Sequence, residues 1–284
     1  MPRILLLLIL FPLCAVSQRK YNLTLFGGFS NYLGDLQEKR FTLDQSHMAF
    51  GAGLNMELMP KLLLHGTLKK GKISADDKLS SRPLNRDRNL NFTSNIYEAA
   101  LTLDYSLFDL AYRRVTPYVF AGGAIFRFNP ITTDRNGRAV ALRNFSTEGQ
   151  GFIDGRKPYP IITISIPMGL GVRVRVTDNA YLGYELGIRK TFTDYLDDVS
   201  TTYVDRDLLL ANRGQRAVEL AFRGDEVKSD LTYPPANTIR GGSKYKDWYY
   251  FSGITLSIGL TNTDGQLFGK KVRKGSVDCP PSVL

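Results

Sequence analysis

The sequence is poor in the residues that most often build catalytic, metal and disulfide sites. It has two cysteines, Cys14 and Cys279, and two histidines, His47 and His65, in 284 residues. Cys14 falls in an N-terminal segment that is expected to be removed, so the mature chain has one cysteine and no internal disulfide. Neither histidine is spaced to pair with a Ser or Cys nucleophile, and no His and Cys cluster has metal-ligand spacing. We therefore expect neither an enzyme nor a metal or other cofactor.

Long apolar runs are also missing, apart from the first one. After the N-terminal stretch ILLLLILFPLCAV, no segment is long enough for an apolar transmembrane helix. Arg3 precedes this stretch and small residues occupy AVS at 15–17, which predicts a secretory signal peptide over 1–17, cut after Ser17. Phe11 and Leu13 do not fit a lipoprotein motif before Cys14. An exported chain without such helices can reside in a membrane only as a barrel.

Charge is unbalanced but not concentrated. The net charge is +10, yet the basic residues are spread along the chain, without a stripe interleaved with base-stacking aromatics. We therefore expect no nucleic-acid partner. The 43% hydrophobic content is enough for a buried core, and 26 Gly with abundant Tyr and Phe suit strands and tight turns.

Alternation with a period of two is the dominant pattern. In IITISIPMGLGVRVRV (161–176) one face carries apolar residues at every even position, and the other carries Thr163, Ser165, two glycines, Arg173 and Arg175. Only a strand separates these sets, because a helix would mix them. Similar alternation recurs along the chain and predicts eight strands, with a further short helix within 207–226.

The connections between these strands alternate strictly between short and long. The short ones lie at 59–61, 109–115 and 177–179, and the long ones at 31–45, 72–91, 129–160 and 193–247. A soluble lipid-binding barrel explains the alternation but not this sorting of loops. We therefore predict an all-β, eight-stranded antiparallel transmembrane β-barrel over 18–261, with long extracellular loops. It lies in the outer membrane with both termini in the periplasm, and 262–284 form a periplasmic tail.

Charged residues of both signs are predicted to point into the barrel. An eight-stranded barrel is just filled by its own side chains, so these charges are expected to form a paired polar core rather than a channel. Aromatic residues near the two strand ends predict two girdles, with Tyr21, Tyr118 and Tyr181 at one end and Phe192, Trp248 and Tyr250 at the other. The predicted inward charged and histidine residues are Glu57, His65, Lys69, Glu98, Asp104, Arg127, Arg173, Arg175, Glu185 and Arg189.

An acidic motif marks the end of the seventh strand. The stretch TFTDYLDDVSTTYVD (191–205) contains Asp194, Asp197 and Asp198, and Asp35 ends the first strand. We expect these four residues to form an extracellular rim. Asp197 and Asp198 are expected to order the rim by hydrogen bonds, for example to backbone amides near NYLGDL (31–36). The alternative is a hard-cation site for Ca²⁺.

Several longer stretches occur in a fixed order: NYLGDL, FAGGAIFRFNP (120–130), TEGQG (147–151), SIPMGLGVR (165–173), IRKTFTDYLDDVSTTYVD (188–205) and WYYFSGITLS (248–257). Together they resemble the PorG-like outer-membrane β-barrel family of Bacteroidota, a component of the type IX secretion system. The resemblance implies a structural barrel that attaches a periplasmic ring of PorK- and PorN-like proteins to the outer membrane, in secretion or gliding motility. A small channel or a surface ligand-binding barrel is the alternative.

The tail is where we expect the periplasmic partner to bind. It carries a compact basic cluster of Lys270, Lys271, Arg273 and Lys274, followed by Cys279. A segment this short does not fold alone but can fold on a partner, although a frayed terminus has the same composition. A single cysteine in an oxidising compartment suggests an intermolecular disulfide. We therefore expect the tail to bind the ring, with Cys279 as a possible covalent link.

Overall fold

Eight long antiparallel strands form a closed barrel in the computed structural model, which describes residues 20–37, 42 and 44–260. Each strand pairs with its neighbours in sequence, and β1 pairs with β10 to close the ring. The predicted eight-stranded antiparallel barrel is thus confirmed, and closure leaves none of these eight strands with an unpaired edge. The strands are β1 (Tyr21–Leu33), β2 (His47–Met59), β3 (Leu62–Asp76), β4 (Asn91–Ser106), β5 (Val115–Arg127), β8 (Ile162–Thr177), β9 (Ala180–Thr191) and β10 (Trp248–Gly259).

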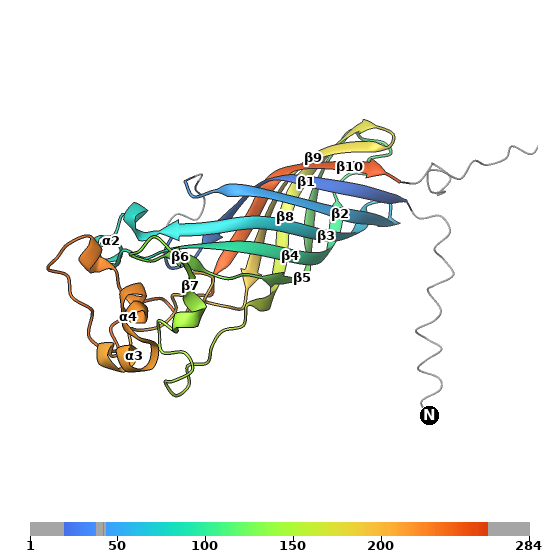
Figure 1. Cartoon of the computed structure of the whole chain (residues 1–284). Coiled ribbons are helices and arrows are strands. Elements are labelled where there is room, and N and C mark those ends of the chain that lie inside the picture. The colour runs from blue at the N-terminus through green and yellow to red at the C-terminus, as the bar shows by residue number, and fades with distance from the viewer. Residues whose placement is uncertain (1–19, 38–41, 43, 261–284) are drawn as a thin grey trace, which may run out of the picture.

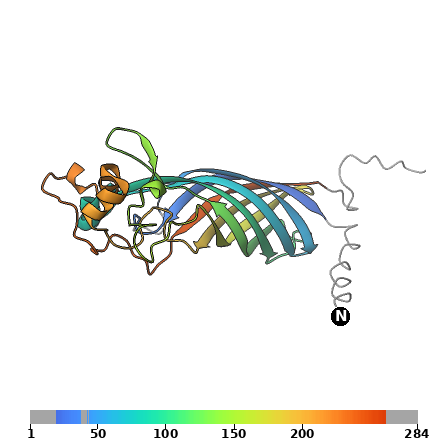
Figure 2. The same cartoon turned by 60° about the horizontal axis from the view of Figure 1, so that its bottom comes forward.

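The long loops gather at one end of the barrel, the loop end, and the short turns lie at the other, the turn end (Figures 1 and 2). The loops at the loop end carry a hairpin and several short helices, and together they form a cap over the barrel. No helix in the described residues is long and apolar enough to cross a membrane. The cap elements are η2 (Asp77–Leu79), α2 (Pro83–Arg88), β6 (Ile131–Thr133), β7 (Ala139–Ala141), η3 (Leu142–Phe145), α3 (Arg206–Arg213), α4 (Gln215–Ala221) and η4 (Gly224–Glu226).

Two details of the cap differ from the prediction. The single helix expected in 207–226 is two helices, because Gly214 between them adopts a left-handed φ of 81°. The loops predicted at 31–45 and 72–91 begin later, because β1 continues to Leu33 and β3 to Asp76. These strand ends extend beyond the apolar part of the barrel and build the base of the cap.

The outer surface of the strands carries a continuous apolar belt. On β4, Tyr97, Leu101 and Tyr105 are about half exposed, whereas the alternate residues Glu98, Thr102 and Asp104 are buried inside. At about 3.3 Å per residue and a strand tilt of about 40°, the outward residues from Tyr97 to Leu107 span roughly 25 Å along the barrel axis. That height equals the lipid-facing band of transmembrane barrels, about 25 Å.

The two faces of strand β5 are reversed relative to the prediction, so the side chains predicted to point inward point outward. Tyr118, Phe120 and Phe126 point inward and are buried, so Arg127 points outward and is exposed. The predicted inward position of Arg127 and the girdle position of Tyr118 are therefore wrong. The reason is that both faces of β5 are apolar, so alternation gives no sign of which face is inside. Tyr250, placed in the other girdle, is buried, and its hydroxyl donates to the Thr42 carbonyl at 3.3 Å.

One hydrophobic core runs from the barrel interior into the cap. Aromatic residues of the inner strand ends, including Phe92, Phe126 and Phe251, belong to the same buried cluster as Leu196 and Leu220 of the cap. The rings of Phe128, Tyr159 and Tyr195 stack in sequence, with centroid distances of 6.1 and 4.7 Å. The cap is therefore a packed continuation of the barrel core.

Candidate functional site

The interior of the barrel is filled by buried ion pairs. Lys69 contacts Glu185 at 2.6 Å, and Arg189 contacts Glu98 at 3.0 Å. Both cations also lie over aromatic rings, since Lys69 Nζ is 4.5 Å from the Phe26 centroid and the Arg189 guanidinium is 4.7 Å from Phe251. Each charge is thus compensated across the barrel, which a buried charge requires.

A second group of pairs lies closer to the turn end. Arg173 contacts Asp104 at 3.3 Å, and His65 Nδ1 lies 3.4 Å from the same carboxylate. The space left between these two groups, beside Thr24 and His65, is about 10 Å³ and holds about one water molecule. Among the residues that the structure describes, paired side chains therefore fill the barrel axis. Seven of the ten predicted inward residues take part in these pairs.

The turn end is open. A cavity of about 420 Å³ lies there, and the predicted inward residues Glu57 and Arg175 line it together with Arg173, Lys61 and Tyr181. Both signs of charge occur in its lining, so it is a polar recess.

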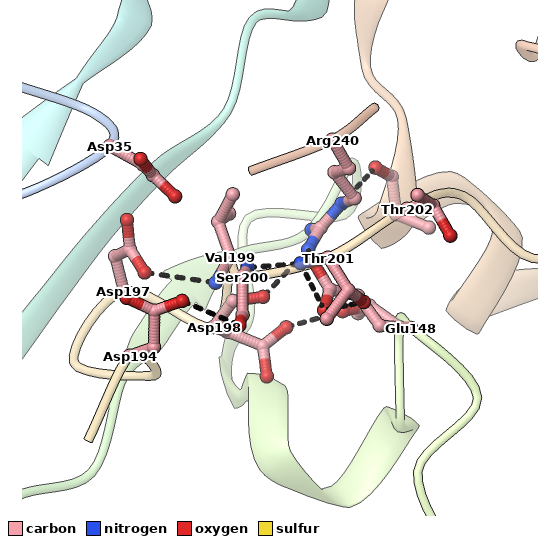
Figure 3. Close-up of polar contacts among 12 residues, drawn as sticks. Asp35, Glu148, Asp194, Asp197, Asp198, Val199, Ser200, Thr201, Thr202 and Arg240 are labelled. Atoms are coloured by element: carbon pink, nitrogen blue, oxygen red, sulfur yellow. Dashed lines mark hydrogen bonds and ion pairs between the residues drawn. The ribbon is translucent and has the colours of Figure 1, made fainter. Parts of the chain in front are cut away.

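The cap is organised around one buried carboxylate, Glu148, in the loop between β5 and β8. It pairs with Arg240 at 2.9 Å, and the side chains of both residues are almost completely buried. It also accepts hydrogen bonds from the backbone amides of Ser200 and Thr201 at 2.9 and 3.0 Å, and from the Thr201 hydroxyl at 2.7 Å. Figure 3 shows these groups converging from different loops.

Arg240 extends this network. Its Nη1 donates to the Asp198 carbonyl at 2.6 Å, and its Nε donates to the Ala221 carbonyl at the end of α4. Burial opposes its charge, but the Glu148 and Asp198 carboxylates raise the pKa of Arg240 above its ordinary value. The Arg240 carbonyl accepts a hydrogen bond from Arg88, which forms a further buried pair with Asp77 at 2.7 Å. The network thus joins the β3–β4, β5–β8 and β9–β10 loops.

The four predicted rim carboxylates gather in the same part of the cap (Figure 3). Asp198 accepts hydrogen bonds from the Thr147 hydroxyl at 2.5 Å and the Tyr159 hydroxyl at 2.7 Å. Asp194 accepts one from the Ser200 hydroxyl at 2.6 Å. Burial raises the pKa of both carboxyls to about 6. Asp35 accepts from the Gly242 amide at 2.7 Å, which joins the β1–β2 loop to the long β9–β10 loop.

Asp197 does reach the NYLGDL segment, but through a side chain and not through a backbone amide. The Tyr32 hydroxyl lies 2.7 Å from Asp197 Oδ2 and 2.9 Å from Asp247 Oδ1. Each carboxyl also accepts one backbone amide, from Val199 and Leu196 respectively, at 2.9 Å. Burial, followed by the neighbouring carboxylates, raises the pKa of Asp197 and of Asp247 well above the usual value.

The cap carboxylates accept hydrogen bonds from protein donors and are not arranged as a set of metal ligands. In the described part of the chain, no group of three or more His, Cys, Asp or Glu side chains is placed to share a metal ion. The ordering role predicted for the acidic motif stays a prediction that the hydrogen bonds above make testable. The signal peptide and the tail candidates Lys270, Lys271, Arg273, Lys274 and Cys279 lie outside the described residues.

Sequence reasoning missed the central residues of the cap. Glu148 lies in the TEGQG stretch, which contributed to the resemblance but was assigned no role, and Arg240 lies in the long connection predicted at 193–247. Tyr32 and Asp247 were likewise not singled out. A buried role is not visible in the sequence for such residues, because Glu148 and Arg240 are 92 positions apart and Tyr32 and Asp247 are 215 positions apart.

A family model described as "Domain of unknown function (DUF6089)" matches residues 2–209, more than two thirds of the chain. No curated protein matches. Among solved structures, Neisserial surface protein A is similar with a TM-score of 0.42 and 9% identity, covering 84% of this chain and 96% of that one. The N-terminal β-barrel domain of Pseudomonas aeruginosa OprF has a TM-score of 0.37 and 11% identity, with 85% and 98% covered. The outer membrane protein OprG from Pseudomonas aeruginosa has a TM-score of 0.39 and 11% identity, and the match covers 85% of this chain and 98% of that one.

Proposed function

The chain belongs to the DUF6089 family, and from the structure of its barrel we propose that it is a non-conducting outer-membrane scaffold that anchors a periplasmic protein complex. The observation that carries this proposal is the filled and capped lumen. The ion pairs Lys69–Glu185 and Arg189–Glu98 occupy the barrel centre, and the Glu148–Arg240 network closes the loop end. A barrel closed in this way offers its outer and end surfaces for binding, and not a route for solutes through its lumen.

The apolar belt supports residence in a membrane. Its height of roughly 25 Å matches the hydrocarbon thickness that transmembrane barrels cover. Exposed leucines, isoleucines and valines surround the barrel, and an apolar surface of this extent is unfavourable in water. With the signal peptide expected at 1–17, the outer membrane is the location that we propose. The loop end then faces the cell exterior, and the turn end and both termini face the periplasm.

The turn end is where the scaffold would hold its partner. The last described residue, Leu260, directly follows β10 and donates its amide to the Tyr21 carbonyl at 2.7 Å, so the tail begins at the turn end. The resemblance to the PorG-like family suggests a ring-forming periplasmic lipoprotein, PorK-like, with its PorN-like companion. In this proposal the tail residues Lys270, Lys271, Arg273, Lys274 and Cys279 make the contact.

Co-purification tests the anchor. The full-length barrel, tagged in a cap loop, is extracted from its own membranes in mild detergent, and we expect a ring-forming periplasmic lipoprotein to copurify. Truncation after Thr261 is expected to abolish the association, and Cys279→Ser to remove a heavier species seen on non-reducing gels. If the truncated barrel retains the partner, the tail is not the contact, and if the intact barrel brings down no periplasmic protein, the scaffold role is wrong.

Electrical recording separates this proposal from the alternative of a small channel. We expect the barrel reconstituted in a planar bilayer to show no stable conductance steps, because paired side chains fill its axis. Stable steps in the unmodified barrel would support the channel instead.

A further inference from the structure

A row of exposed cationic and aromatic residues marks the loop-end margin of the apolar belt. Lys70 of β3 pairs in register with Tyr97 of β4, which pairs with Arg127 of β5. All three side chains point outward, and Lys70 Nζ lies 5.5 Å from the Tyr97 ring centroid. Lys72, two residues further along the same face of β3, is also exposed. Three cations therefore face outward around one tyrosine on three adjacent strands.

None of these cations forms an ion pair with a carboxylate in the described part of the chain, in contrast to the buried Lys69 next to Lys70. An Arg or Lys on the lipid-facing side of a barrel is costly at the bilayer centre and tolerated near the interface. At the interface each cation near an anionic headgroup strengthens its binding about fivefold. The row lies at that level, because Tyr97 forms the loop-end limit of the belt on β4.

Below this row the outer surface of the barrel is hollowed. Two contiguous apolar depressions of about 770 and 650 Å³ share the residues Leu68, Ala99 and Ile125, and the second one reaches Lys70, Tyr97 and Arg127. The hollow arises because small side chains on neighbouring strands alternate with larger ones. These small outward residues are Ala52, Gly66, Ala99 and Gly123.

We infer that this surface binds a phosphorylated membrane lipid, with its phosphate between Lys70 and Arg127 and one acyl chain in the groove beneath. Strands two apart are separated by about 10 Å, a distance that an extended Lys and an extended Arg bridge by each reaching toward one phosphate. Lys72 adds a third positive charge on the headgroup side. Tyr97 lies between them with its ring at the interface, as aromatic residues of barrel girdles do. The inference rests on the proposed membrane location of the barrel.

The test uses the full-length barrel, refolded in detergent and mixed with lipid A that carries its phosphates or with the same lipid after enzymatic dephosphorylation. Native mass spectrometry counts the lipid molecules retained per barrel. We expect one phosphorylated lipid A to be retained, and the dephosphorylated lipid to bind at least tenfold more weakly. The double variant Lys70→Gln/Arg127→Gln is expected to lose about 30-fold in affinity.

Two control variants are matched to the two halves of the site. Lys190→Gln removes an outward cation of β9, outside this row, and leaves the affinity unchanged. Gly123→Leu fills the groove and weakens binding, whereas Gly27→Leu, on β1, has no effect. An added Cβ meets nothing within 4 Å at either glycine, so both substitutions are tolerated by the fold.

Equal binding of the two lipids, or an unchanged affinity in the Lys70→Gln/Arg127→Gln variant, would overturn the inference and leave the groove as ordinary lipid-facing surface. Heat-modifiable migration of the barrel reconstituted in bilayers is measured in parallel. If the barrel fails to insert, the membrane location itself is wrong, so the two failures are distinguished.

Discussion

The hydroxyl of Tyr32 contacts two carboxyls but carries one proton. It lies within hydrogen-bonding distance of both Asp197 and Asp247, and a phenol can donate only once. The second contact is a hydrogen bond only if one of the two carboxyls is itself protonated and donates to the phenol oxygen. The raised pKa of both carboxyls, caused by burial and by their neighbouring carboxylates, agrees with one shared proton.

This arrangement predicts opposite outcomes for two substitutions at Asp247. Asp247→Ala removes the contact to Tyr32 and leaves the buried Leu196 amide without its acceptor, which costs about 2–4 kcal/mol of cap stability. Asp247→Asn keeps an acceptor for that amide and supplies a permanent donor to Tyr32. It should lie within about 1 kcal/mol of the natural protein at pH 5.

The sign of the pH dependence follows from the raised pKa. Protonation of the pair stabilises the cap fully below the unfolded carboxyl pKa of 3.8, and this contribution is lost as pH rises through the higher folded pKa. The Asp247→Asn cap should therefore become more stable than the natural one at pH 8. Its own stability should depend less on pH.

Limited proteolysis of the folded barrel in detergent, between pH 5 and pH 8.5, measures how often the cap opens. A loss of 2 kcal/mol increases the open population roughly 30-fold, which sets the expected effect of Asp247→Ala. Asp207→Asn is the control, because that carboxyl is in the cap but its side chain is 85% exposed. If Asp247→Asn opens the cap as much as Asp247→Ala at every pH, both carboxyls are ionised and the shared-proton argument fails.

Three further predictions concern the cap and the topology. Glu148→Ala leaves Arg240 buried without a counter-ion and should lower cap stability by about 3–5 kcal/mol, measured by hydrogen exchange; a loss under 1 kcal/mol would show that the pair is not central. Raising the pKa of Asp198 from 3.8 to about 6 favours the protonated native form by up to about 3 kcal/mol, a contribution present below pH 4 and lost by about pH 6. Asp198→Asn should therefore flatten the pH profile of cap cleavage between pH 4 and 7, and an unchanged profile would contradict this assignment. Finally, a cysteine at Lys244 should react with an impermeant maleimide on intact cells while one at Asn179 should not, and the reverse pattern would invert the proposed orientation.

The barrel itself was determined by local sequence pattern. A strand with one face toward lipid and the other toward a polar interior must alternate, so each strand could be recognised from its own residues. The alternation also assigned most inward charges, including Glu98, Asp104 and Glu185. It failed on β5, where Phe120 and Phe126 fill the interior and the outer face is apolar too. There the facing was decided by which side chains fit between the neighbouring strands.

The partners within the cap were decided only by the tertiary structure. Closure of β1 against β10 places Leu33 opposite Trp248, and this register carries Tyr32 to Asp247 across 215 positions of sequence. In the same way the folded loops bring Glu148 to Arg240. The sequence could place the acidic motif at the end of a strand, because that depends on local pattern. It could not pair the carboxylates with their donors, because hydrogen bonds depend on distances of a few tenths of an ångström that only the closed barrel and packed loops set.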